Sequence, residues 1–210
     1  MSTKPRRAAV VSSGFTKDLD MAGWLPYGLQ RRDFANAMEA IYDFFESINT
    51  ALMGRGLEWF ENTVRAAAVS NVISDLSAAS VAKHSNGLVL NRKHNGHPDL
   101  IPRGTYPDDT VAAGEEGVEI KSTRGRVADT HGARAGWVCQ FNYKVDPEPI
   151  IARRNPTVIT HIYLANVTEA LFRRNERKTG LGTHTSTLDK SGLAVLRQGL
   201  IYQDPSVAKK

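Results

Sequence analysis

The sequence contains a single cysteine, Cys139, among its 210 residues. One cysteine excludes an internal disulfide and any zinc site built from several cysteines. Long apolar runs are also missing, because no stretch approaches the roughly 18 to 20 residues that a membrane-spanning helix needs. The basic start of the chain, residues 1–11, is not followed by the apolar stretch of a secretory signal. We therefore expect a cytoplasmic protein that makes no membrane contact.

Several common motifs are absent as well. The chain has no internal repeat, no phosphate-binding P-loop, no dinucleotide-binding glycine pattern and no Gly-x-Ser-x-Gly nucleophile motif. These absences argue against nucleotide cofactors and serine hydrolase chemistry, and we expect no organic cofactor. Cys139 falls on the apolar side of an alternating segment, so we interpret it as a core residue.

Positive charge is in excess, with a formal net charge of +5 and a pI near 9.4. Such a balance suits a polyanionic partner, and the distribution of the charge is more informative than its sum. Basic residues gather near both ends of the chain and in its middle, at positions 4–7, 124–134, 153–154 and 173–178. The cluster at 124–134 directly follows the segment described next, where a bound phosphate would need it.

Acidic and basic side chains alternate with apolar ones at residues 117–123, Gly-Val-Glu-Ile-Lys-Ser-Thr. In a β-strand, residues two apart point to the same side. Glu119 and Lys121 therefore share one face, while Val118 and Ile120 turn toward a core. A Pro-Asp pair ending in Asp99 precedes a short apolar segment upstream. Two carboxylates and an amine on neighbouring strands can hold a divalent cation and position a water molecule, which is the chemistry of phosphodiester cleavage.

The Pro98-Asp99 pair, its spacer and Glu119-Ile120-Lys121 resemble the PD-(D/E)XK nuclease superfamily, which includes many type II restriction endonucleases. The motif covers about a tenth of the chain, and a surface hairpin with a solvated Glu–Lys pair is the alternative that structural context must exclude. The resemblance implies a Mg²⁺-dependent endonuclease that cuts double-stranded DNA. It implies that Asp99, Glu119 and the Ile120 carbonyl bind the metal and that Lys121 orients or helps deprotonate the attacking water.

The resemblance also implies a homodimer, because cleavage of both strands of a palindrome matches a two-fold axis in the protein. A type II restriction enzyme is the function that it favours. Two alternatives remain at this point. One is a repair or recombination nuclease acting on branched or damaged DNA, and the other is a DNA-binding protein with a degenerate, inactive copy of the fold.

In the superfamily, an acid from an upstream helix often completes the metal site. Residues 31–53 and 57–83 have helical periodicity, the second with a possible break near Asn71 or Ser74. On a helical wheel, Glu61 falls inside the apolar stripe of the second helix and Glu58 falls at its edge. Glu61 is therefore the candidate metal ligand, with Glu58 as the second choice; the alternative is that Glu61 pairs with a basic side chain.

Periodicity in the rest of the chain predicts the fold class. Strand patterns near residues 88–101, 117–123, 137–145 and 158–167 follow the two helices. We expect one α/β domain over residues 1–210, with a restriction-endonuclease-like core: a central mixed β-sheet flanked by helices, two of them N-terminal. Residues 1–30 lack a clear period and form an irregular arm in this interpretation. Residues 175–190 form a basic loop, and residues 169–174 and 191–200 suggest short helices.

Candidate DNA-binding residues come from the basic segments and from one polar strand face. The polar side of residues 137–145 carries Gln140 and Asn142, which either reach the metal water or a phosphate or belong to a solvated face. Hydroxyl-rich residues follow the last basic cluster and suit phosphate and base contacts, although an ordinary surface loop has the same composition. The candidates are Arg124, Arg126, Arg134, Gln140, Arg173, Arg174, Arg177 and Lys178.

Three histidines, His84, His94 and His97, lie upstream of the Pro-Asp pair. Structural zinc sites usually need four ligands, often cysteine. The histidine spacing also lacks the wider pattern of a ββα-metal nuclease. We expect these histidines to be loop residues near the DNA or the site and not a metal centre of their own.

Overall fold

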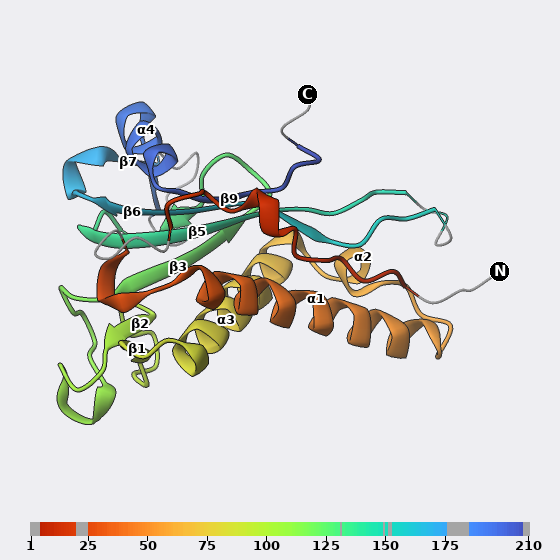
Figure 1. Ribbon diagram of the computed structural model, residues 1–210, viewed down its shortest axis with the longest axis horizontal. Helices are drawn as coiled ribbons and strands as arrows, with labels where there is room; N and C mark the ends of the chain where they lie inside the picture. Colours follow the sequence, from red (N-terminus) through yellow and green to blue (C-terminus); the bar gives the residue numbers. More distant parts are fainter. Residues whose placement is uncertain are drawn as a thin grey trace.

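The computed structural model describes residues 5–19, 25–130, 132–148, 150, 153–175 and 185–207. Figure 1 shows a central sheet with α1 and α3 on one face, while α4 and a second, smaller sheet lie toward the other. The mixed α/β class, the central mixed sheet and the two N-terminal helices are thereby confirmed. Within the described residues, no helix is both long and apolar enough to cross a membrane.

Helix α1 (Arg31–Met53) has the predicted bounds. Its first turn is closed by a capping box: the Gln30 side chain accepts from the Asp33 backbone N–H, and the Asp33 side chain accepts from the Gln30 backbone N–H. Phe34, Met38 and Ile41 are buried on one stripe, as the periodicity predicted. This stripe packs on α3 and contributes to the main hydrophobic core.

The second helical region is divided in a different place from the one predicted. Helix α2 (Phe60–Thr63) is a single turn, and α3 (Ala66–His84) begins after Val64 and Arg65 adopt extended backbone angles. A wheel drawn continuously through residues 57–68 therefore joins two helices of unrelated phase. Leu57, at the start of that wheel, precedes α2, lies in no helix and is 54% exposed. Helix α3 instead buries Val69, Ile73 and Val81.

The main sheet has six strands in the order β1-β2-β3-β5-β6-β9. Their bounds are β1 (Leu88–Leu90), β2 (Leu100–Pro102), β3 (Val118–Thr123), β5 (Gly136–Lys144), β6 (Val158–Val167) and β9 (Leu200–Gln203). Strands β3 and β5 are parallel and the other neighbouring pairs are antiparallel, so the sheet is mixed. Helix α3 covers β3, and the apolar residues of β3 and β5 enter the core on that side.

The second sheet has three strands in the order β4-β8-β7: β4 (Asp129–Thr130), β8 (Ser186–Leu188) and β7 (Phe172–Arg174). Helix α4 (Lys190–Gln198) packs on β6 beside it, and a smaller apolar cluster joins Val138, Ala165 and Leu196. The expected short helix at residues 169–174 is a 3₁₀ turn, Glu169–Leu171, followed by β7. The expected helix near residues 191–200 is α4.

Three further 3₁₀ turns complete the described elements: Ser12–Gly14, Pro26–Gly28 and Pro107–Asp109. The first belongs to the segment expected to be irregular, and Phe15 after it forms an isolated bridge with Tyr202 of β9. Gly117, just before β3, has a φ of +133°, and a Cβ atom there would lie 2.1 Å from the Leu100 carbonyl oxygen. Glycine is needed at this point because the chain must pass close to β2 before Glu119.

Candidate active site

Strand β3 places an acid and an amine on its face away from α3. Val118 and Ile120 are buried in the core on the other face, which follows from the two-residue period of a strand. The Lys121 Nζ atom donates a hydrogen bond of 2.5 Å to Glu119 Oε1. Both side chains are largely buried, at 20% exposure for Lys121 and 14% for Glu119. The pair is therefore not the solvated surface pair that the sequence left as an alternative.

Asp99 reaches β3 from the neighbouring strand. It immediately precedes β2, which pairs with β3 only at Leu100 and Val118. Two residues along β3 from Val118, the backbone N–H of Ile120 donates a 2.8 Å hydrogen bond to the Asp99 Oδ2 atom instead of to a backbone carbonyl of β2. The N–H and C=O of one strand residue point to the same side, so the Ile120 carbonyl also faces the Asp99 edge.

A histidine completes this group, although no role in the site was predicted for it from the sequence. The His97 Nδ1 atom lies 2.8 Å from Glu119 Oε2. The backbone of His97 is held on both sides, because its N–H donates to Ala112 O at 3.1 Å and its carbonyl accepts from Gly114 N–H at 2.7 Å. The expectation that the histidines lie near the site holds for His97. The signal available in the sequence was its position two residues before Asp99.

Two hollows meet at these side chains. One has a volume of about 470 Å³ and the other about 580 Å³, and Asp99 and Lys121 line both. The first is also bordered by His97 and Glu119, by Arg134 from the loop after β4, and by Phe172 from β7. The second is bordered by α3 and by the end of β3, through Asn71, Ser74, Asp75, Ser122 and Thr123. Asp99 and Lys121 are therefore accessible from two separate hollows.

The two carboxyl groups titrate in opposite directions. Burial, followed by the negative charge of Glu119, raises the pKa of Asp99 to about 6. Burial also opposes ionisation of Glu119, but the contacts with His97 and Lys121 outweigh it and lower the pKa of Glu119 to about 2. The site therefore favours one ionised carboxylate and keeps a second one available for a cation as the pH rises through about 6.

The donor set fits a hard divalent cation such as Mg²⁺. This ion takes one or two carboxylates and keeps several waters, so it does not need a complete cage of protein ligands. The Glu119 Oε2 atom is buried, and its geometry toward His97 leaves it without a well-directed hydrogen bond among the described residues. Within the same described part of the chain, no group of three or more His, Cys, Asp or Glu side chains is arranged to hold a metal. Asp99, Glu119 and the Ile120 carbonyl would hold the ion together with water.

The prediction that Glu61 joins this site is not supported by its position. Glu61 is buried, as expected, but its Oε2 accepts from Asn49 Nδ2 at 2.8 Å and its Oε1 accepts from Thr157 Oγ1 at 2.5 Å. Both partners are neutral, so the expected alternative of a basic partner is also wrong. Glu58, the second choice, is exposed and accepts only a 3.5 Å hydrogen bond from Asn62.

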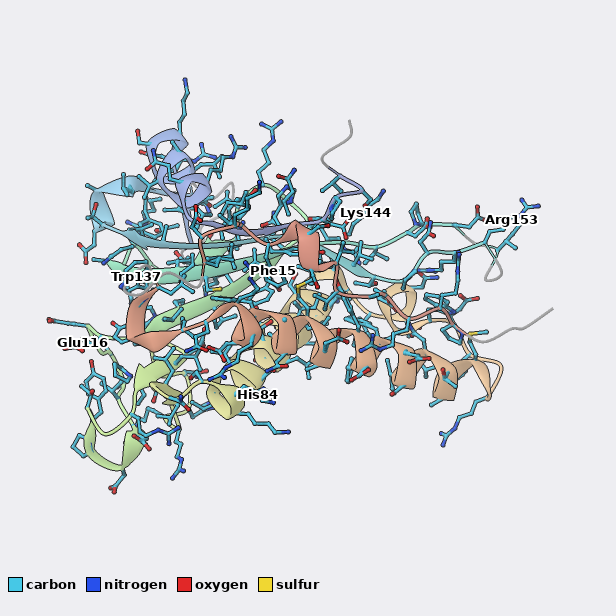
Figure 2. The ribbon with its side chains drawn as sticks, viewed as in Figure 1. Phe15, His84, Glu116, Trp137, Lys144 and Arg153 are labelled. Carbon is cyan, nitrogen blue, oxygen red and sulfur yellow. The ribbon has the colours of Figure 1, made fainter. Side chains whose placement is uncertain are left out.

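The register of the sheet shows how far Glu61 is from the other acids. Glu119 lies beside Val138 of β5, whereas Thr157 precedes Val158, which pairs with Lys144. Six strand residues separate Val138 from Lys144, which corresponds to roughly 20 Å. Figure 2 shows Trp137 and Lys144 at the two ends of β5, with Arg153 beyond the Lys144 end. The carboxylate of Glu61 therefore connects α1, α2 and β6 at the far end of the sheet.

The acid that α3 does bring to the region is Asp75. It is exposed and lines the larger hollow together with Asp99 and Lys121. A helical wheel drawn from residue 57 does not predict this position, because the phase of α3 is set by its own start at Ala66. A helix beginning at Ala66 leaves Asp75 outside the buried stripe of Val69, Ile73 and Val81.

The basic candidates fall into three groups. Arg124, Arg126 and Arg134 are exposed on the segment between β3 and β5, and Arg134 borders the smaller hollow. Arg173 and Arg174 are exposed on β7, next to Phe172, which borders the same hollow. Arg177 and Lys178 lie outside the described residues.

Gln140 has a different place from the one predicted for a DNA contact. It is 1% exposed, and its Oε1 accepts from the Ala128 N–H at 2.9 Å while its Nε2 donates to Arg126 O at 3.2 Å. Asn142 beside it donates to Gly125 O at 2.6 Å. Gln140 and Asn142 are therefore neither solvated nor free to contact DNA, because they hold the backbone of residues 125–128 in place.

No family model matches the sequence, and no curated protein matches it. Among solved structures, the chain is similar to the crystal structure of the restriction endonuclease BglI bound to its DNA recognition sequence. The identity is 13%, the TM-score is 0.38, and the alignment covers 83% of this chain and 84% of that one. We transfer no residue role across so distant a likeness.

Proposed function

We propose that the protein is a Mg²⁺-dependent DNA endonuclease of the PD-(D/E)XK type. The observation that carries the proposal is the convergence of Asp99, Glu119 and Lys121 on one hollow of about 470 Å³. Glu119 and Lys121 come from β3 and Asp99 from the residue just before the neighbouring β2, although about 20 residues of sequence separate the two halves of the motif. A chance occurrence of Pro-Asp and Glu-x-Lys would not require the two halves to meet side by side in the folded sheet.

The roles follow from the positions of the atoms. Asp99, Glu119 and the Ile120 carbonyl would bind the cation, which when bound would stabilise charge on the phosphate oxygens and lower the pKa of a coordinated water. Lys121 would orient the attacking water, or help to deprotonate it by stabilising the hydroxide that forms. His97 would keep the Glu119 carboxylate in place. Asp75, on the opposite side of the β3 edge, faces the larger hollow.

Double-stranded DNA is the substrate that the surroundings favour. Exposed arginines border or adjoin the smaller hollow on two separate elements, the segment after β3 and strand β7. Basic side chains around a cleavage site hold the phosphates on either side of the cut. We further propose a type II restriction enzyme that acts as a homodimer on a symmetric site.

The test is cleavage of supercoiled plasmid DNA by the purified protein with Mg²⁺ and with EDTA. We expect Mg²⁺-dependent cutting that Asp99→Ala and Lys121→Ala reduce by about 1000-fold or more, in line with the loss of a group acting in the transition state. Glu116→Gln is the matched control for Glu119→Gln, since Glu116 is exposed in the loop just before β3. Equal cleavage by the wild type and the Asp99 and Lys121 variants would overturn the proposal.

The same assay separates the related functions. Discrete fragments from linear DNA indicate a restriction enzyme, whereas cutting confined to nicked, branched or mismatched substrates indicates a repair or recombination nuclease. DNA binding without cleavage, tested with several different divalent cations, would indicate an inactive copy of the fold. Analytical ultracentrifugation with and without DNA tests the homodimer.

A further inference from the structure

The Glu119 carboxylate has two partners of different kinds, one on each oxygen. Lys121 Nζ binds Oε1 at 2.5 Å, and His97 Nδ1 lies 2.8 Å from Oε2. A cation held by Glu119 and Asp99 must share this carboxylate with at least one of them. Which partner gives way therefore decides how the site accepts a metal.

Lys121 brings a positive charge to the two carboxylates that would bind a cation, and its ammonium is hydrogen-bonded to Glu119 Oε1. Its charge acts on both carboxylates, stabilising the ionised forms of Glu119 and of Asp99. Its side chain also borders both hollows, as that of Asp99 does. A divalent cation would replace such an ammonium group, because the cation brings twice the charge to the same two carboxylates.

His97 has less freedom to leave. Lysine has four flexible side-chain bonds and three equivalent donors, whereas histidine has two side-chain torsions and a rigid ring. The backbone of His97 is hydrogen-bonded to Ala112 O and Gly114 N, so the residue is held on both sides. Its ring therefore approaches Glu119 from a fixed point, while the Lys121 ammonium can move into either hollow.

We propose that Lys121 and the divalent cation are alternative partners of Glu119 and Asp99, and that His97 is a positioning residue that keeps Glu119 oriented during the exchange. The proposal rests on the metal site of the proposed function and adds an order to it. Lys121 is bound to Glu119 in the metal-free protein and is released toward the water only when the metal is present. The amine is thereby kept from acting on water in the absence of the cation.

The exchange predicts opposite effects on cation affinity for two residues that contact the same carboxylate. The probe is Mn²⁺, titrated into the full chain without DNA and followed by calorimetry and electron paramagnetic resonance. Lys121→Met removes the competing ammonium and should raise the Mn²⁺ affinity by roughly threefold or more. His97→Ala removes the support of Glu119 and should lower it by about 10- to 100-fold, as is usual for groups that orient a metal ligand.

Two neighbours in the preceding loop supply matched controls. Lys93 and His94 are exposed, and neither borders either hollow. Lys93→Met tests whether loss of a nearby positive charge alone raises the Mn²⁺ affinity. His94→Ala tests the loss of an imidazole. Each should change the Mn²⁺ affinity by less than about twofold. His97→Asn keeps an N–H donor near the position of Nδ1 and should recover most of the affinity that His97→Ala loses.

Each outcome decides the proposal. The exchange is wrong if Lys121→Met binds Mn²⁺ no better than wild type or no better than Lys93→Met. The positioning role is wrong if His97→Ala, folded by circular dichroism, binds Mn²⁺ as wild type does, or if His97→Asn is no better than His97→Ala. If the wild type cuts DNA but all variants bind Mn²⁺ as tightly as the wild type, this inference is wrong and the proposed function stands. Wild-type protein that neither binds Mn²⁺ nor cuts DNA overturns both.

Discussion

Asp99 is the residue at which function and stability are most directly opposed. Burial, followed by the negative charge of Glu119, raises the pKa of its carboxyl from the ordinary 3.8 to about 6. A raised pKa means that the folded protein prefers the protonated form. The stability contributed by this proton is complete below the unfolded pKa of 3.8 and is lost as the pH rises through about 6. At neutral pH the metal-free protein therefore carries an unfavourable ionised group that a cation would compensate.

Asp99→Asn should stabilise the metal-free protein. The amide cannot ionise and can still accept the Ile120 hydrogen bond, so the gain over wild type should be small at pH 4 and reach about 1 to 3 kcal/mol at pH 7 to 8. Chemical denaturation in EDTA across this pH range measures it. A gain that is equally large at pH 4 would show that ionisation of Asp99 is not the cause.

Glu61 shows the opposite relation, a buried acid with a structural task. Its oxygens accept from Asn49 and Thr157, and Asn49 Oδ1 also accepts from the Phe60 N–H at 2.8 Å. These bonds connect α1, the start of α2 and the residue before β6. Removing the carboxylate would leave buried donors without partners, which costs more than the bonds themselves contribute.

Glu61→Ala should lower the free energy of unfolding by about 2 to 4 kcal/mol. The same variant should bind Mn²⁺ as wild type does at a temperature where it is folded, because its carboxylate is at the far end of the sheet. Denaturant titration and Mn²⁺ calorimetry together make the test. Unchanged stability with a loss of Mn²⁺ binding would return Glu61 to the metal site.

At the scale of elements, the polar face of β5 sets the conformation of the basic segment after β3. The Gln140 and Asn142 side chains form hydrogen bonds with the backbone of Gly125, Arg126 and Ala128. Arg124 is also held, with its guanidinium 5.6 Å from the centre of the Tyr143 ring. The arginines are thus presented on a supported segment beside Lys121.

Gln140→Ala should loosen this segment without unfolding the sheet. We expect faster trypsin cleavage after Arg124 and Arg126, and a loss of DNA affinity of about threefold to tenfold because ordering the segment then costs entropy on binding. Limited proteolysis with mass spectrometry and fluorescence anisotropy measure the two effects. Lys144→Ala, an exposed change on the same face of β5, is the control and should alter neither.

At the scale of the whole molecule, the positive charge should act as a DNA-binding surface around the two hollows. The formal net charge is +5. Exposed Arg134 borders the smaller hollow, and exposed Arg173 and Arg174 follow Phe172, which borders the same hollow. Contacts of this kind bind phosphates and release counterions, so they make affinity depend on salt and not on sequence.

Replacing Arg173 and Arg174 together with alanine should weaken DNA binding at all sequences. The slope of log affinity against log salt should fall by roughly one for each phosphate that is no longer neutralised, so by up to about two. Binding is measured between about 50 and 200 mM salt with EDTA present, so that no DNA is cut. Lys83→Ala, at the exposed end of α3, is the control. An unchanged slope for the double variant would place the DNA elsewhere.

Local periodicity was enough to predict α1, five strands of the main sheet (β1, β2, β3, β5 and β6) and the face on which Glu119 and Lys121 lie, but not the short strands β4, β7, β8 and β9. The period of a helix or strand is a property of the backbone, so the side on which a residue falls can be read from its neighbours along the chain. The same reasoning failed between residues 57 and 68, where the break at Val64 and Arg65 changed the phase of the helix.

The sequence by itself therefore determined the fold class and the acid–amine pair of β3. Only the tertiary structure decided the partners of these groups: His97 beside Glu119, Asp75 at the second hollow, Glu61 bound to Asn49 and Thr157, and Gln140 buried under residues 125–128. Each of these depends on which segments, distant along the chain, come within about 3 Å of one another, since a hydrogen bond forms only at that range. Spacing along the chain carries no information about that approach.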